Sequence, residues 1–245
     1  MKKNLMMVIL MSLTFGVPFL FSNGVVEGAE YCVSSSSEIQ NALTAAASNE
    51  EDDLIQIVQG TYTGNFVYTS GQLNNLTIEG GYSTGCSSRT DPPANTVLDA
   101  SGSGTVLQLN GSLDAIIDGI TLQNGGNSGL IASLGRDFLI SNCKIQYNTG
   151  NNGGGARLTA KKIEITNNTI MSNVAKTGGG VDIQGSTPEI TTFAGNIISQ
   201  NITNDAEGGG VQIKWGSPTV NFINNVISRN ATTIYVGGGH GGSTH

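Results

Sequence analysis

The sequence NNTIMSNVAKTGGGVDI at residues 167–183 decides the fold, because related copies stand on both sides of it. They read NCKIQYNTGNNGGGARL at 142–158, GNIISQNITNDAEGGGVQI at 195–213 and NNVISRNATTIYVGGGH at 224–240. Each copy has an Asn, aliphatic residues, a second Asn, a polar segment and a glycine triplet. The triplets begin at Gly153, Gly178, Gly208 and Gly237, so the steps are 25, 30 and 29 residues. A repeat of this length is typical of solenoids.

The ordered segments within a copy are short and alternate apolar with polar residues, as in Ile163-Glu164-Ile165 and Val181-Asp182-Ile183. This alternation predicts strands with one buried face. Gly and Asn between the segments favour sharp turns. Roughly three short strands and three turns per copy predict an all-β fold, in which each repeat is one rung of a parallel β-helix.

One asparagine recurs at the same turn of every copy. We interpret it as an internal ladder, in which each side-chain amide bonds to backbone groups or to the amide of the next rung. We prefer this role to ligand binding. The ladder residues are Asn148, Asn173, Asn201 and Asn230. The segment LQNGG carries an earlier copy of the repeated asparagine, Asn124.

Two copies carry a further motif. GGGVDI is followed by FAGN at residues 193–196, and GGGVQI is followed by FINN at residues 222–225. These segments resemble the GGA[ILV] and FxxN repeats of polymorphic outer-membrane proteins and, more broadly, the right-handed parallel β-helix repeats of bacterial secreted and surface proteins. The resemblance covers about residues 118–239, and it departs where Val replaces Ala after the glycines and where Ile165 replaces the first Phe. It implies a right-handed β-helix at the cell surface or outside the cell.

Residues 1–29 read as a signal peptide. Lys2 and Lys3 precede an apolar stretch at residues 5–21, and small residues allow cleavage after Gly28 or Ala29. The alternative is an uncleaved N-terminal anchor helix. Either way we expect the rest of the chain to be exported, to the outside or the outer surface of a bacterium, with no membrane span in the mature chain.

Export places the three cysteines in an oxidising compartment. Cys32 and Cys86 lie outside the repeats in polar, turn-rich surroundings, so we predict a disulfide between them. The resemblance of IEGGYSTGCSSR to the opening of bacterial secreted β-helix proteins adds to this pairing. Cys143 occupies the repeat position of Asn168 and Asn225, so we expect a packed free thiol there.

Residues 30–53 are expected to close the N-terminal end of the solenoid, and the β-helix is expected over residues 54–239. Ser35 and Glu38 form a capping box, and apolar residues at helical spacing follow, so we predict a short capping α-helix. The acidic run at residues 50–53 is expected to be a solvated turn rather than a calcium site. Residues 240–245 form a glycine-rich tail. We expect a truncated solenoid there, the alternatives being protection of the last rung by assembly or fraying.

Candidate catalytic residues are few. Asp182 is the one acid among the outward residues Arg157, Asp182 and Gln212, and Asp205 and Glu207 lie in the loop before a glycine triplet. The GHG sequence around His240 lacks the paired acids that glycoside hydrolysis needs, so we interpret it as a coincidence. We expect no metal and no cofactor, because no zinc-binding spacing or phosphate-binding loop occurs in the sequence.

The resemblance to surface repeat proteins and the lack of a catalytic set favour binding over catalysis. Without residues 1–29 the chain keeps 9 of its 11 basic and 17 of its 18 acidic residues, a net charge of −8, which argues against nucleic acid as a partner. Our first hypothesis is an adhesin-like scaffold that binds glycans or surface proteins without catalysis. The alternative is a polysaccharide lyase or glycoside hydrolase whose catalytic set is incomplete in this chain.

Overall fold

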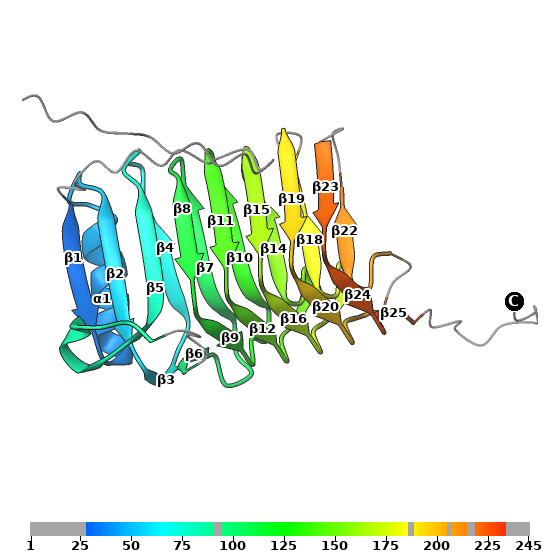
Figure 1. Ribbon diagram of the computed structural model, residues 1–245, viewed down its shortest axis with the longest axis horizontal. Helices are drawn as coiled ribbons and strands as arrows, with labels where there is room; N and C mark the ends of the chain where they lie inside the picture. Colours follow the sequence, from blue (N-terminus) through cyan, green and yellow to red (C-terminus); the bar gives the residue numbers. More distant parts are fainter. Residues whose placement is uncertain (1–27, 91–94, 186–188, 205–206, 215–218, 234–245) are drawn as a thin grey trace, which may run out of the picture.

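The chain forms a parallel β-helix. The computed structural model describes residues 28–90, 95–185, 189–204, 207–214 and 219–233. Figure 1 shows the strands stacked rung on rung, from the N-terminal end with β1 and α1 to the C-terminal end with β23 and β25. The predicted signal peptide up to residue 27, Asp205 and the glycine-rich tail lie outside the described residues.

The strands form four sheets, named here A to D, in which strands of neighbouring rungs pair in parallel. Sheet A contains β1 (Ala29–Val33), β2 (Asp53–Val58), β5 (Leu76–Tyr82), β8 (Ala115–Asp118), β11 (Asp137–Ser141), β15 (Lys162–Thr166), β19 (Ile190–Ala194) and β23 (Thr219–Ile223). Sheet B contains β3 (Gly60–Thr63), β6 (Thr96–Asp99), β9 (Thr121–Gln123), β12 (Lys144–Gln146), β16 (Thr169–Met171), β20 (Ile197–Ser199) and β24 (Val226–Ser228). Sheet C contains β4 (Phe66–Thr69), β7 (Thr105–Gly111), β10 (Ser128–Leu134), β14 (Ala156–Thr159), β18 (Val181–Ile183) and β22 (Val211–Ile213). Sheet D contains β13 (Thr149–Asn152), β17 (Val174–Thr177), β21 (Ile202–Thr203) and β25 (Ala231–Thr232).

The predicted alternation sets the core. In β15, Ile163 and Ile165 are buried while Glu164 between them is partly exposed. The rungs before the last therefore contribute inward apolar side chains to one continuous cluster along the solenoid. In the last rung, by contrast, Phe222 and Ile227 are exposed. The all-β prediction is confirmed, although the rungs from β13 onward also have a short segment in sheet D, which the prediction of three strands did not include.

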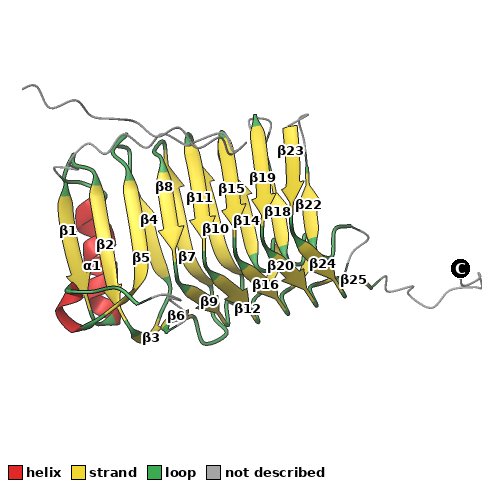
Figure 2. Ribbon diagram, in the orientation of Figure 1, coloured by secondary structure: helices red, strands yellow, loops and turns green. Residues whose placement is uncertain are grey.

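A short helix closes the N-terminal end, as predicted. Helix α1 (Ser36–Ala46) packs against β1, β2 and β4, and Figure 2 shows it in red beside the first strands. Its N-cap Ser35 accepts a hydrogen bond from the backbone N–H of Glu38, whose carboxylate in turn accepts one from the N–H of Ser34 at 2.7 Å. Its own residues Ile39 and Leu43 are buried against the core, so the helix covers the end of the solenoid where a further rung would otherwise be needed.

The region of residues 30–53 differs from expectation in two ways. Strand β1 precedes the helix and pairs with β2, so sheet A begins before the segment where the first strand was predicted. Asp53, predicted in a solvated turn, is 3% exposed and accepts a hydrogen bond from Asn49 Nδ2 at 2.6 Å. The acidic run at residues 50–53 had suggested a solvated turn. However, Asp53, the last residue of this run, is the first residue of β2 and is buried with that strand.

The asparagine ladder is present in the structure. Asn173 Oδ1 accepts from the backbone N–H and Nδ2 of Asn148, and Asn173 Nδ2 donates to Asn201 Oδ1 at 3.0 Å and to the carbonyl of Ile145. Asn201 repeats the pattern with Asn230. Asn124, the earlier copy of the repeated asparagine, does not belong to this ladder. In that rung the ladder position is Gly125, whose N–H donates to Asn148 Oδ1, and the Asn124 side chain donates to Asp99 instead.

A second ladder, which the sequence analysis missed, runs through the turn between sheets A and B. Asn168 Nδ2 donates to Asn196 Oδ1 at 3.1 Å, and Asn196 Nδ2 donates to Asn225 Oδ1 at 2.9 Å. Cys143 occupies the next position, and its N–H donates to Asn168 Oδ1. Its thiol is buried, and burial raises the pKa of that thiol to about 12.

The structure contains the disulfide between Cys32 and Cys86, with their Cα atoms 5.8 Å apart. Cys32 belongs to β1, and Cys86 ends the short 3-10 helix η1 (Thr84–Cys86) in the segment between β5 and β6. The bridge therefore ties this excursion to the first strand of the solenoid.

Among the described residues no helix is both long and apolar enough to cross a membrane.

Candidate functional site

Three outward side chains form a row across sheet C. Arg157 on β14 is the Cα partner of Asp182 on β18, which is the Cα partner of Gln212 on β22. Each is the middle residue of an apolar-x-apolar segment, so its neighbours along the strand point toward the core. Paired strands lie about 4.8 Å apart, which brings the three side chains next to one another.

The glycine triplets bring these strands into register. The first glycine of the second triplet, Gly178, turns the chain with a φ of 61°. A Cβ on Gly179 would lie 2.5 Å from the carbonyl oxygen of Ile202, and one on Gly180 would overlap the carbonyl oxygen of Gly210. Because only glycine permits this close approach, the triplet fixes where the segment containing Asp182 begins.

Asp182 is fully buried on the outer side of sheet C. Its Oδ2 accepts a hydrogen bond from Gln184 Nε2 at 2.6 Å, while its Oδ1 has no hydrogen-bond partner. Burial raises the pKa of this carboxyl group, against the opposing effects of the Gln184 hydrogen bond and of the positive charges on Lys214 and Arg157. The group can therefore bind or release a proton closer to neutrality than an ordinary Asp.

Gln212 continues the polar network toward the preceding loop. Its Nε2 donates to Glu207 Oε2 at 2.6 Å, and its Oε1 is buried without a hydrogen-bond partner. Lys214, two residues further along, donates from Nζ to Thr177 Oγ1 at 3.1 Å. The face thus offers a carboxyl group, two side-chain amides, an ammonium and a guanidinium.

The three acids singled out from the sequence have different positions. Asp182 is central to the row, Glu207 is joined to the row through Gln212, and Asp205 lies outside the described residues. Sequence reasoning missed Gln184 and Lys214. Both stand two residues after an outward residue of sheet C, and the period-two alternation could have placed them on the same face.

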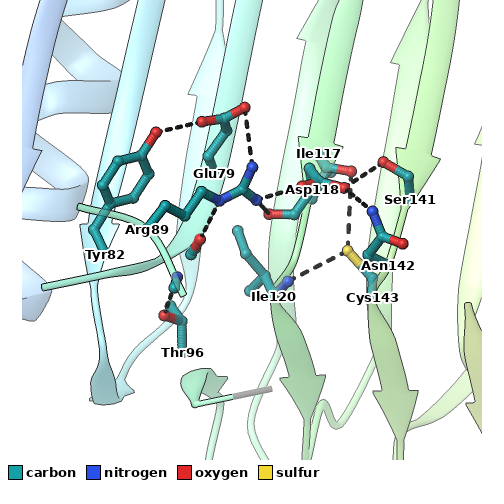
Figure 3. Close-up of polar contacts among 12 residues, drawn as sticks. Glu79, Tyr82, Arg89, Thr96, Ile117, Asp118, Ile120, Ser141, Asn142 and Cys143 are labelled. Atoms are coloured by element: carbon teal, nitrogen blue, oxygen red, sulfur yellow. Dashed lines mark hydrogen bonds and ion pairs between the residues drawn. The ribbon is translucent and has the colours of Figure 1, made fainter. Parts of the chain in front are cut away.

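A second polar cluster lies on the outer side of sheet A and is shown in Figure 3. Arg89 forms ion pairs with Glu79 and Asp118, and its Nε donates to the carbonyl of Gly80 at 2.8 Å. Tyr82 donates to Glu79, and the guanidinium lies 5.7 Å from the centre of the Tyr82 ring. Burial and Glu79 raise the pKa of Tyr82 to about 12.

Both acids of this second cluster have partners. Asp118 also accepts hydrogen bonds from Ser141 Oγ and Asn142 Nδ2. Arg89 therefore attaches the excursion after β5 to two neighbouring rungs, which is a structural role. The row on sheet C differs because two of its buried oxygens lack a partner, so it is the better candidate for a functional site.

Comparison with known proteins identifies the repeat type. A family model described as "Right handed beta helix region" matches residues 25–244. The chain belongs to this family. The match supports the right-handed β-helix and gives no support to the more specific resemblance to polymorphic outer-membrane proteins.

Among curated proteins no match was found. Two solved structures of the pectin methylesterase from Aspergillus niger, one deglycosylated and one penultimately deglycosylated, are each 15% identical to this chain. Each alignment covers 80% of this chain and 85% of the other, with a TM-score of 0.43. This likeness is too distant to carry an argument about activity or substrate.

Proposed function

We propose that this protein is an exported, adhesin-like β-helix scaffold that binds extracellular glycans on the outer face of sheet C. One observation carries the proposal. Asp182 and Gln212 lie on adjacent strands, and Asp182 Oδ1 and Gln212 Oε1 are buried without a hydrogen-bond partner. Leaving such acceptors unpaired costs stability. A ligand that donates hydrogen bonds to them recovers this free energy.

A sugar has the groups that this face lacks. Its hydroxyls donate to the two acceptors, while Arg157 and Lys214 can donate to its ring and hydroxyl oxygens. Lys214 donates to Thr177 in this face, and its ammonium has further N–H donors for a ligand. Because the two acceptor oxygens are buried, binding involves side-chain rearrangement on a rigid backbone.

Export is supported by two independent features. The N-terminal residues have the charge and hydropathy pattern of a signal peptide. The disulfide between Cys32 and Cys86 is of a kind that persists in oxidising compartments. Both favour an extracellular or cell-surface location.

A second candidate function, a carbohydrate-active enzyme, is favoured by the raised pKa of Asp182. A buried carboxyl group that holds its proton toward neutral pH is suited to general acid catalysis. Glycoside hydrolysis in most families requires a second carboxylate. Glu207 is the candidate, because it accepts a hydrogen bond from Gln212, the Cα partner of Asp182 on the adjacent strand.

One experiment separates the two functions. The chain without residues 1–29 is applied to a glycan array and incubated with a panel of polysaccharides, including pectin and pectate, with and without calcium. Binding without cleavage supports the scaffold, whereas release of reducing ends or of unsaturated products supports the enzyme.

Variants then test the location. Asp182→Asn and Arg157→Gln are expected to abolish binding, or turnover if an enzyme is found. Glu164→Gln, a carboxylate change on the outer side of sheet A, serves as the matched control and is expected to have no effect. Unchanged binding by both sheet C variants would show that the ligand lies elsewhere.

A further inference from the structure

A second unpartnered acceptor lies on the outer side of sheet B, away from the row on sheet C. There, Asp99 on β6, Gln123 on β9 and Gln146 on β12 are Cα partners on successive rungs. Gln123 Nε2 donates to Asp99 Oδ2 at 2.8 Å, and Gln146 Nε2 donates to Gln123 Oε1 at 2.9 Å. Together these residues form a side-chain hydrogen-bond chain, here called the Gln146 chain.

The carboxylate at one end fixes the direction of this chain. Although burial raises the pKa of Asp99, hydrogen bonds from Gln123, Ser101 and Asn124 hold it below its usual value. An ionised carboxylate only accepts hydrogen bonds. Gln123 must therefore present its NH₂ group to Asp99 and its oxygen to Gln146, and Gln146 must present its own NH₂ group to Gln123.

The chain consequently ends on an acceptor. Gln146 is 8% exposed, and its Oε1 is buried with no hydrogen-bond partner. The next position in the row is Met171 on β16, whose side chain cannot donate a hydrogen bond. Exchanging the oxygen and nitrogen of the Gln146 amide would not remove the unpaired acceptor, because Gln146 Oε1 would then face the acceptor Gln123 Oε1.

The residue that follows Gln146 in the chain is an exposed aromatic one. Tyr147 follows Gln146 directly, at the corner where the chain leaves β12 with a φ of 57°. Its side chain is 55% exposed. Aromatic rings with an apolar face and a polar hydroxyl are suited to stacking on a ligand that has both kinds of surface.

We propose that Gln146 and Tyr147 form a binding subsite for a neutral sugar, with the ring stacked on Tyr147 and a hydroxyl donating to Gln146 Oε1. The unbranched Met171 side chain moves aside to admit the hydroxyl, as its flexible thioether chain allows. The subsite is independent of the proposed site on sheet C, because β13 in sheet D separates β12 from β14 within the rung.

Affinity electrophoresis of the mature chain tests this inference. The gels contain hydroxyethylcellulose, glucomannan, xyloglucan or galactan, which are neutral polysaccharides. We expect retardation in at least one gel, with Tyr147→Ala lowering the affinity about tenfold and Tyr147→Phe retaining it. Leu73→Ala, which removes an apolar side chain that is 62% exposed elsewhere, is the matched control and should leave retardation unchanged.

Met171→Gln gives a readout that a general loss of folding cannot imitate. The new amide can donate to Gln146 Oε1 just as Gln146 donates to Gln123, so this variant is expected to melt at a higher temperature and to lose retardation. Retardation in none of the four gels would overturn the inference. So would retardation that is insensitive to Tyr147→Ala and Met171→Gln. If Asp182→Asn alone removed it, the ligand would lie on sheet C, and the proposed function would stand without this subsite.

Discussion

Asp182 and Gln212 are Cα partners on adjacent strands, and each has one buried side-chain oxygen without a hydrogen-bond partner. Two acceptors side by side cannot satisfy each other. A proton on Asp182 Oδ1 would change this, since the resulting hydroxyl could donate to Gln212 Oε1. The pair is therefore stabilised by a proton or by a ligand that donates hydrogen bonds, and this requirement links stability and binding at one place.

Asp182→Asn is expected to stabilise the protein. The new amide can donate to Gln212 Oε1 while its oxygen keeps the hydrogen bond from Gln184, so the variant should gain about 1 to 3 kcal/mol in the free energy of unfolding at pH 8. The pKa of Asp182 is raised in the folded protein, so folding favours its protonated form. The contribution of Asp182 to wild-type stability therefore falls as pH rises above about 4. The gain should therefore shrink toward low pH.

Denaturant unfolding at pH 4 and pH 8 measures this gain. Glu189→Gln, a change at an exposed acid, is the control and should alter stability little at either pH. Destabilisation by Asp182→Asn at pH 8 would contradict the picture of two unsatisfied acceptors.

Asp53 provides a second pH-dependent contribution, at the other end of the solenoid. Burial, with Glu51 and Asp52 adding to it against the Asn49 hydrogen bond, raises its pKa to about 6. The pKa of Asp53 in the folded protein exceeds its ordinary value. The contribution of Asp53 to stability is therefore fully present below about pH 4 and is lost as pH rises to about 6. Asp53→Asn should therefore stabilise the protein at pH 7 by on the order of 2 kcal/mol and have little effect at pH 4.

Unfolding free energies of wild type and Asp53→Asn at these two pH values check this expectation. Glu30→Gln, at an exposed position of β1, is a suitable control. An equal gain at both pH values would mean that the titration of Asp53 is not its cause.

Asn173→Ala is expected to be one of the most destabilising single changes in the chain. Asn173 is fully buried, and its removal leaves the N–H of Asn148 and the carbonyl of Ile145 without their side-chain partner. Each buried group left unpaired costs about 1 to 3 kcal/mol, so a loss of about 3 to 5 kcal/mol follows. Guanidinium unfolding measures it against Asn75→Ala, which alters an exposed Asn and should cost less than about 1 kcal/mol. Similar losses for the two variants would show that the ladder adds little to stability.

Features set by the local repeat were predictable from the sequence, and features set by tertiary contacts were not. The position of Asn173 in a ladder follows from its recurrence at one turn. The second ladder was harder to see, because Cys143 interrupts its pattern. Strand β1 has no repeat around it and is defined by its pairing with β2.

The candidate site shows the same division. Alternation placed Asp182 on the outer face of its strand, in line with Arg157 and Gln212, as the register shows. Alternation also implies exposure to solvent, yet Asp182 is fully buried. Burial on an outer face depends on tertiary contacts of the side chain, here including the hydrogen bond from Gln184, which no local pattern encodes.

Cys143→Asn tests whether the second ladder can be extended by one rung. The thiol already occupies the ladder position: Sγ accepts from the N–H of Ile120 at 3.4 Å and lies 3.9 Å from the carbonyl oxygen of Ile117. An Asn there can accept from Ile120 and donate to both Ile117 and Asn168 Oδ1, as Asn168 does with the equivalent groups. The added hydrogen bonds should outweigh the strain of a slightly larger side chain, for a net gain of about 1 kcal/mol.

Denaturant unfolding with the disulfide intact compares Cys143→Asn with Cys143→Ala. The alanine variant removes the sulfur without supplying an amide and is expected to lose about 1 to 2 kcal/mol. A stability of Cys143→Asn equal to that of the alanine variant would mean that the turn before β12 cannot accommodate the ladder geometry. A higher stability of Cys143→Asn would show that Cys143 deprives the ladder of the side-chain hydrogen bonds that an Asn makes at this position. It would also show that the ladder can be extended toward the N-terminal end.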